Sequence, residues 1–165
     1  MGCYRTILVA LDGSRDADAA LRHAVTLARD QHARLILLAV VPPPPPHLVT
    51  VAGAVVPAEL QTYFARLLRE TAAALPDDVG VETRLVHGSP ARHILQVARD
   101  CRCDLIVMGF HGHGRLHSAL LGSVSRTVLH DGRLPVLLMR AAEPEAEPAP
   151  AREQEDEPDL TAGAV

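Results

Sequence analysis

The residues best suited to chemistry lie in a glycine-punctuated segment in the last third of the chain. Gly109, Gly112, Gly122 and Ser123 follow an apolar run and precede a helix-like pattern. Glycines turn the backbone tightly and leave no Cβ to block a ligand, and the unpaired N–H groups at a helix N-terminus attract an anion. The pattern predicts a phosphate-binding loop, although a glycine-rich turn that only joins a strand to a helix would have the same composition.

A second polar segment, Asp12-Gly13-Ser14, follows an apolar run near the N-terminus. Its residues have the chemistry of a turn and of a helix cap. Asp12 therefore has two interpretations from sequence, as a ligand-binding carboxylate or as a simple helix cap.

Five short apolar runs alternate with helical patterns, and they indicate the elements that position these residues. We expect strands over residues 5–11, 34–41, 81–86, 105–108 and 135–139, and helices from Ser14, from about Ala58 to Leu75, from Ser89-Pro90 to Asp100, and from Ser123. This order predicts an α/β domain, an open parallel sheet with helices on both faces. Ligands of such folds bind beyond the carboxyl ends of the strands, where both polar segments would lie if the first and fourth strands are neighbours.

Composition excludes several kinds of site. The chain has 165 residues, enough for one domain with a sizeable core. All 16 basic residues are arginines, so a Walker-type lysine and Schiff-base chemistry are excluded. Two Phe, two Tyr and no Trp argue against recognition of single-stranded nucleic acid by base stacking.

Charge divides the chain into two parts. Residues 141–165 hold eight acidic residues and one arginine, a net charge of −7, so residues 1–140 carry +3 of the total of −4. The Glu- and Pro-rich segment 141–165 is predicted to be a disordered tail, and residues 1–140 to be the folded domain. A body of +3 does not suggest duplex DNA as a partner. No apolar run is long enough to span a membrane, and a cytoplasmic location is expected.

The spacing Gly109-x2-Gly112-x9-Gly122-Ser123 resembles the nucleotide-binding motif of the universal stress protein A family, in its ATP-binding type. Further matching segments are residues 7–14, Gly88 to Ala91 with Ile94 and Ala98, Cys103 to Gly109, and Pro135 to Leu138. The resemblance covers nearly all of residues 4–140. It implies an adenine nucleotide α-hydrolase-like fold with strand order 3-2-1-4-5, and a homodimer formed through the fifth strand.

The same resemblance implies a site for ATP and Mg²⁺. Gly109, Gly112, Gly122 and Ser123, with Val124 and the Ser125 hydroxyl, would hold the phosphates; Asp12 would lie near the ribose and the metal, Ala10 would line the pocket, and the backbone of Val40 or Val41 would meet adenine. The prolines Pro42 to Pro46 abut the expected adenine end and could reshape it. The implied role is a nucleotide-sensing or regulatory module in stress response, with at most slow ATP hydrolysis or autophosphorylation.

Other interpretations of the sequence, without a nucleotide or with a metal, are also possible. A nucleotide-independent dimeric interaction module would use the edge of the fifth strand and the acidic tail. His111, His113 and His117 could form a metal site, but they lack a carboxylate partner at fixed spacing. Cys101 and Cys103 are interpreted as free thiols, because no second Cys/His cluster at zinc spacing accompanies them.

Overall fold

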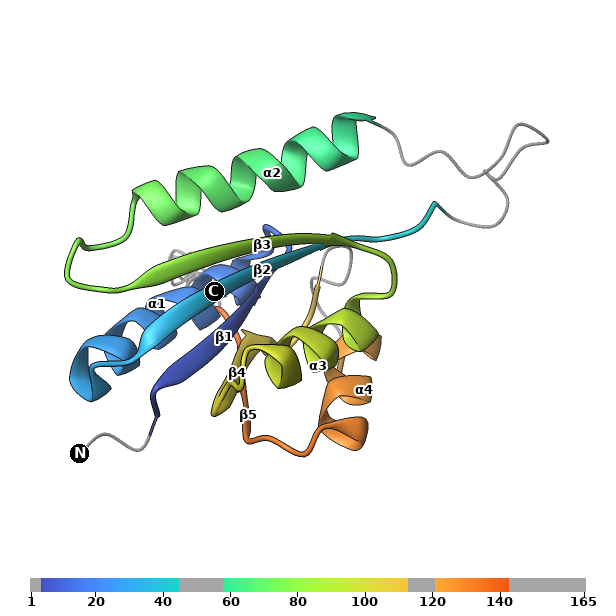
Figure 1. Cartoon of the computed structure of the whole chain (residues 1–165). Coiled ribbons are helices and arrows are strands. Elements are labelled where there is room, and N and C mark those ends of the chain that lie inside the picture. Colours follow the sequence, from blue (N-terminus) through green and yellow to red (C-terminus); the bar gives the residue numbers. More distant parts are fainter. Residues whose placement is uncertain (1–3, 45–57, 113–120, 143–165) are drawn as a thin grey trace, which may run out of the picture.

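A computed structural model describes residues 4–44, 58–112 and 121–142 of the chain (Figure 1). Its strands are β1 (Thr6–Leu11), β2 (Arg34–Val41), β3 (Val81–His87), β4 (Leu105–Gly109) and β5 (Val136–Met139). Its helices are α1 (Arg15–Gln31), α2 (Ala58–Ala73), α3 (Pro90–Asp100) and α4 (Ser123–Asp131). The alternation predicted from the apolar runs is confirmed, and the predicted ends differ from the observed ones by two residues at most.

The five strands form one parallel sheet in the order β3-β2-β1-β4-β5. This confirms the predicted fold class and strand order. The order reverses between β1 and β4, which are hydrogen-bonded neighbours, with Ile7 opposite Leu105 and Val9 opposite Val107. The carboxyl ends of β1 and β4 therefore lie side by side, and the two polar segments that follow them meet beyond these ends.

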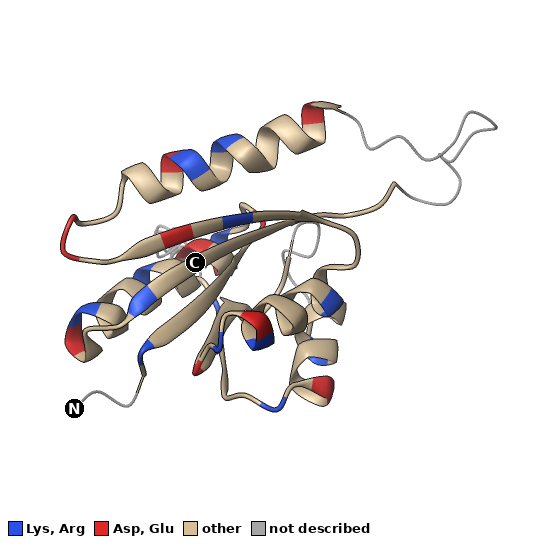
Figure 2. Ribbon diagram, in the orientation of Figure 1, with Lys and Arg blue, Asp and Glu red and all other residues tan. Residues whose placement is uncertain are grey.

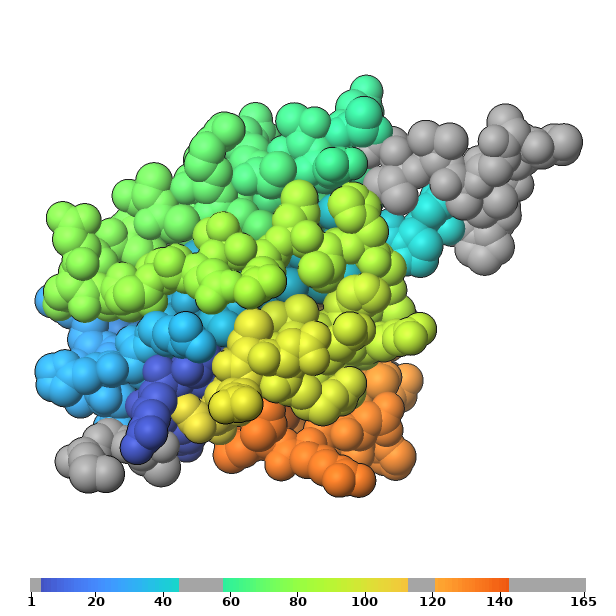
Figure 3. Space-filling model, in the orientation of Figure 1, coloured from blue at the N-terminus to red at the C-terminus, as the bar shows by residue number. Residues whose placement is uncertain are grey.

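Alternating side chains of the strands supply two cores, one on each face of the sheet. On one face Ile7, Val9 and their equivalents on β2 and β4 pack against α1 and α2. On the other face Leu8, Ile36 and Ile106 pack against α3 and α4. The result is a three-layer arrangement (Figure 1), in which α3 and α4 lie next to each other on their face (Figure 3).

The two edges of the sheet are β3 and β5, in agreement with the strand order that the resemblance implies. Charged side chains lie mainly on the helices and the turns, whereas the central strands carry almost none (Figure 2). Among the described helices, none is both long and apolar enough to cross a membrane. The residues from 143 onward, which include most of the predicted acidic tail, and Pro45 and Pro46 lie outside the described part of the chain.

Candidate functional site

A cleft of about 680 Å³ lies beyond the carboxyl ends of β1, β2 and β4. Its polar end is formed by the segments that follow β1 and β4 and by the first residues of α4; its apolar end is formed by β2, α2 and α3. Of the residues predicted to bind a nucleotide, Ala10, Asp12, Val40, Gly109, Gly112, Ser123 and Val124 line it, and Val41, Gly122 and Ser125 do not. The sheet topology therefore brings together most of a set that spans more than 110 positions of the chain.

Asp12 lies at the polar end, half-buried, with its two carboxylate oxygens in different roles. Oδ1 accepts a hydrogen bond from the Ser14 N–H at 2.9 Å. Oδ2 lies against Gly112, so close that a Cβ at position 112 would be 2.8 Å from it. Ser14 is the N-cap of α1 and accepts from the Ala17 N–H at 3.2 Å, so the interpretation of Asp12 as the helix cap is wrong.

The N-terminus of α4 borders the same end of the cleft. Its N-cap is Gly122, which has no side chain to accept the first N–H groups of the helix. The Gly122 N–H itself donates to Phe110 O at 3.2 Å. The N–H groups of Ser123, Val124 and Ser125 have no acceptor among the described residues. Ser123 and Val124 line the cleft together with Asp12, so two of these unpaired donors and the positive end of the helix dipole belong to its polar end.

Ser125 does not reach the cleft in this structure. Its residue surface is 3% exposed, and its hydroxyl donates to Gly109 O at 2.9 Å, with Phe110 O at 3.3 Å. The side chain therefore joins the first turn of α4 to the end of β4. A phosphate contact through this hydroxyl, which the resemblance implied, would require the hydrogen bond to Gly109 to break.

Gly109 is required by packing rather than by a ligand alone. A Cβ there would be 2.9 Å from both Ala17 N and Asp16 Cβ, in the first turn of α1. Real Cβ atoms do not approach backbone this closely. The first glycine of the motif thus allows α1 to lie against the end of β4, which is a structural role that sequence spacing does not reveal.

Asp16 is a central residue of the site that the sequence did not identify. Its Oδ2 accepts from the His111 N–H at 3.0 Å and lies 3.2 Å from His111 Nδ1, and its Oδ1 accepts from the Ala141 N–H at 2.8 Å. Burial raises the pKa of the Asp16 carboxyl, but the hydrogen bonds from Ala141 and His111 outweigh it, and the pKa lies below its ordinary value. This carboxylate ties α1 to the segments after β4 and β5.

The segment after β5 makes a second contact with the segment after β4. The Arg140 guanidinium lies 4.4 Å from the centre of the Phe110 ring, which packs edge-on against His111 at 4.7 Å. Asp16 could have been noted only as an acidic residue in the first turn of a helix, a common feature with many uses. Neither Phe110 nor Arg140 carries a sequence signal for this contact.

The apolar end of the cleft is formed by α2 and its neighbours. Leu60, Tyr63 and Phe64 line it from α2, and the Tyr63 and Phe64 rings meet edge-to-face at 5.2 Å. Val40 points into the cleft, whereas Val41 points to the opposite core and its carbonyl accepts from the Gly88 N–H at 2.9 Å. Of the proline run, Pro42 forms part of the wall.

The sequence also contains histidines and cysteines that could form a metal site. Within the described ranges, no group of three His, Cys, Asp or Glu side chains is placed to hold a metal. His113 and His117 lie outside those ranges, so the histidine metal site stays untested. Cys101 and Cys103 are free thiols, as predicted, and burial raises the pKa of Cys103 to about 12.

Comparisons with known proteins agree with this geometry. A model of the Universal stress protein family matches residues 3–140. A curated universal stress protein of Thermus aquaticus is 36% identical over 138 residues, which are 83% of this chain and 99% of the relative. A solved structure from the universal stress protein family of Burkholderia pseudomallei is similar with a TM-score of 0.67 and 31% identity, covering 86% of this chain and 99% of its own. A universal stress protein solved in complex with cAMP has a TM-score of 0.63 at 25% identity, covering 86% and 100%.

Proposed function

This chain belongs to the universal stress protein family, and from that premise we propose that its cleft binds an adenine nucleotide, ATP together with Mg²⁺. The binding serves a cytoplasmic sensing or regulatory role in stress response rather than fast turnover. A relative of the same fold was solved with cAMP, which supports an adenine nucleotide as the ligand class.

The observation that carries the proposal is the polarity of the cleft. One end offers the unpaired N–H groups of Ser123 and Val124 at the start of α4, where phosphate oxygens would accept. The other end offers Val40, Tyr63 and further apolar side chains, against which a base would lie. A volume of about 680 Å³ is in the range of small-molecule sites.

The residues at the polar end also fit a magnesium ion. Asp12 has one carboxylate oxygen held by Ser14 and a second that faces Gly112 at the rim of the cleft. Mg²⁺ commonly takes one or two carboxylates together with phosphate oxygens and water. Asp12 would hold the ion, and the ion would supply the positive charge that the lysine-free loop lacks.

The required affinity is modest. A dissociation constant of 1 mM corresponds to only about −4 kcal/mol. A hydrogen bond to a charged oxygen contributes about 1.5–3 kcal/mol. The two free N–H groups of α4 that line the cleft, together with the magnesium ion, can therefore supply binding in the millimolar range after the costs of association, without a lysine.

The test is calorimetric titration of the full chain with ATP, with and without Mg²⁺, after analysis of the heat-released supernatant for bound nucleotide. Ser123→Asp should weaken ATP binding about hundredfold, because a carboxylate at this position repels phosphate while it still favours the helix N-terminus. Thr127→Asp, one turn further along α4, adds the same charge on an exposed position away from the cleft.

Absence of heat at several millimolar ATP in the folded wild-type chain would overturn the proposal. Equal losses in Ser123→Asp and Thr127→Asp would move the nucleotide elsewhere. Titration with cAMP under the same conditions decides which adenine nucleotide is preferred: tighter binding of cAMP than of ATP would refute ATP as the ligand.

We further propose that the chain forms a homodimer through β5. This strand pairs with β4 on one side only, and its four residues Val136–Met139 are all partly exposed. An apolar edge strand is prone to pair with another chain. Light scattering should give the mass of a dimer, and Leu138→Lys should give a monomer. If Ser123→Asp abolishes ATP binding but the dimer persists, nucleotide binding and dimer formation are separate functions. If the wild-type chain forms the dimer but binds no nucleotide, it is the nucleotide-independent interaction module.

A further inference from the structure

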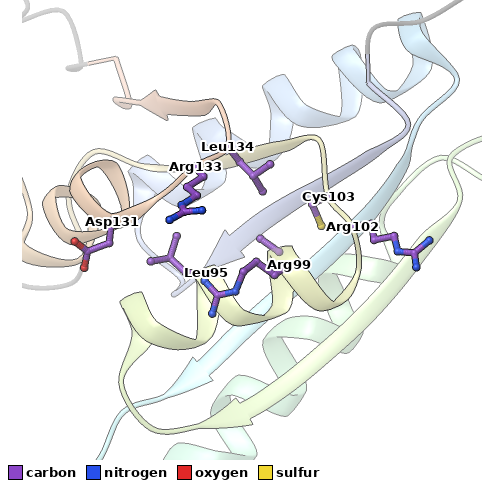
Figure 4. A pocket seen from close by; sticks show the side chains of 8 residues that line it. Leu95, Arg99, Arg102, Cys103, Asp131, Arg133 and Leu134 are labelled. Atoms are coloured by element: carbon purple, nitrogen blue, oxygen red, sulfur yellow. The ribbon is translucent and has the colours of Figure 1, made fainter.

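A second cavity, of about 560 Å³, is lined by residues of α3, of α4 and of the segments before β4 and β5 (Figure 4). It opens between α3 and α4. Cys103 and Leu134, which line it, come just before β4 and β5, so the cavity adjoins the amino ends of these strands. It shares no lining residue with the cleft.

Arginines surround this cavity. Arg99 is on α3, Arg102 is in the turn before β4, and Arg133 is in the loop after α4. Figure 4 shows the side chains of Arg99 and Arg133 reaching toward Leu95 between the two helices, whereas Arg102 points away. Two guanidinium groups from different elements therefore face one space.

Neither guanidinium is directly paired with a carboxylate within the part of the chain that the structure describes. Arg99 and Arg133 make no hydrogen bond or ion pair there. The one carboxylate at the cavity, Asp131, is held by His130 Nδ1 at 2.7 Å. Two cations facing the same cavity repel each other, and an oxyanion between them would remove this repulsion.

The floor of the cavity is apolar. Leu95 and Ala98 contribute to it from α3, and Leu134 from the loop before β5. Arg99 also lies in the last turn of α3, where a positive charge offsets the helix dipole. That role accounts for one arginine, but it requires neither a second guanidinium opposite nor an apolar floor between them.

We infer that this cavity is a second ligand site, for a small organic oxyanion. Its phosphate or carboxylate group lies between Arg99 and Arg133, because the planar guanidinium pairs with such oxygens by two parallel hydrogen bonds. A short apolar body lies against Leu95 and Leu134. The cavity volume fits a small molecule rather than a bare ion. The site does not depend on nucleotide binding at the cleft.

The probes are phenyl phosphate, benzoate and inorganic phosphate, titrated into the full chain and followed by backbone amide NMR. Saturable shifts at Leu95, Cys103 and Leu134 are expected, with phenyl phosphate bound about tenfold more tightly than inorganic phosphate because its ring is removed from water. Comparison of phenyl phosphate with benzoate decides which head group is preferred.

Arg133→Gln and Arg99→Gln should each weaken phenyl phosphate binding about thirtyfold, the loss of a charge-assisted pair. Arg22→Gln, on α1 at the other face of the sheet, is the control and should change it by less than about twofold. Circular dichroism verifies that each variant is folded.

Three outcomes overturn the inference. If no probe saturates, or if Arg22→Gln weakens binding as much as Arg133→Gln, the arginines only offset the helix ends. If Ser123→Asp abolishes phenyl phosphate binding, the anion is bound at the cleft and the second site does not exist. If Ser123→Asp abolishes ATP binding alone, the two sites are independent, as expected.

Discussion

The two ends of the cleft are built in different ways. At the polar end, polar side chains are already engaged with the protein: Asp16 with His111 and Ala141, and Ser125 with Gly109. At the apolar end, half-buried side chains such as Tyr63 line the cleft from α2 and have apolar packing partners. One end is held together by long-range hydrogen bonds and the other by packing.

This difference separates residues that hold the site together from residues that face a ligand. Gly109, Asp16 and Ser125 join α1, β4 and α4, so substitutions there should act on stability. Ser123 and Tyr63 border the open space and should act on affinity. A motif that is read from sequence alone contains both classes without distinguishing them.

The largest effect is expected at Gly109. Gly109→Ala places a Cβ 2.9 Å from Ala17 N and Asp16 Cβ, and α1 must move away from β4. Overpacking of this kind costs about 3 kcal/mol, and thermal denaturation should show a Tm lower by roughly 6–12 °C. Gly80→Ala is the matched control, since its Cβ would be 3.6 Å from Arg34 Cβ, an ordinary contact. Equal stability of the two variants would show that α1 does not need this glycine.

A smaller loss is expected at Asp16. Asp16→Asn replaces one acceptor oxygen by an NH₂ group that must face either the His111 N–H or the Ala141 N–H. We expect a loss of about 2 kcal/mol in denaturant unfolding at pH 7. Asp18→Asn removes the same charge from the same helical turn at an exposed position and should cost less than about 0.5 kcal/mol.

The pH dependence gives an independent check on Asp16. Its folded-state pKa is lowered, so its contribution to stability is complete above the unfolded pKa of about 4 and disappears as the pH falls through the folded pKa. The difference in unfolding free energy between wild type and Asp16→Asn should therefore shrink as the pH falls below 4. A difference that grows below pH 4 would contradict this assignment.

The sequence predicted the fold well because the signals for it are local. Buried parallel strands are continuous apolar runs, as at residues 34–41, and caps such as Ser14 and Ser89-Pro90 mark helix starts. The site was predicted in part. Spacing identified the residues after β1 and β4, but the partners of Asp16 lie 95 and 125 positions away, and no local pattern encodes such contacts.

Ser125 belongs to the nucleotide-binding motif, yet the structure places it among the residues that hold the site together. Ser125→Ala removes the buried hydrogen bond to Gly109 O and should cost about 1 kcal/mol of stability. The affinity for ATP should stay within about twofold of wild type, because the hydroxyl does not line the cleft. Calorimetry with ATP and denaturant unfolding measure the two quantities. A tenfold loss of ATP affinity at unchanged stability would show that the Ser125 hydroxyl does contact the phosphates.

The smallest effect is expected at the apolar end, where Tyr63 borders the cleft. Tyr63→Ala should weaken ATP binding about threefold, because the base loses part of its apolar wall. It should leave the affinity for inorganic tripolyphosphate unchanged, since that ligand occupies the polar end alone. Gln61→Ala, exposed on the same helix, is the control. If Tyr63→Ala weakens the binding of tripolyphosphate and of ATP equally, the substitution acts through the whole cleft and the two ends are not independent. If it weakens the binding of ATP alone, α2 contacts the base while α4 holds the phosphates.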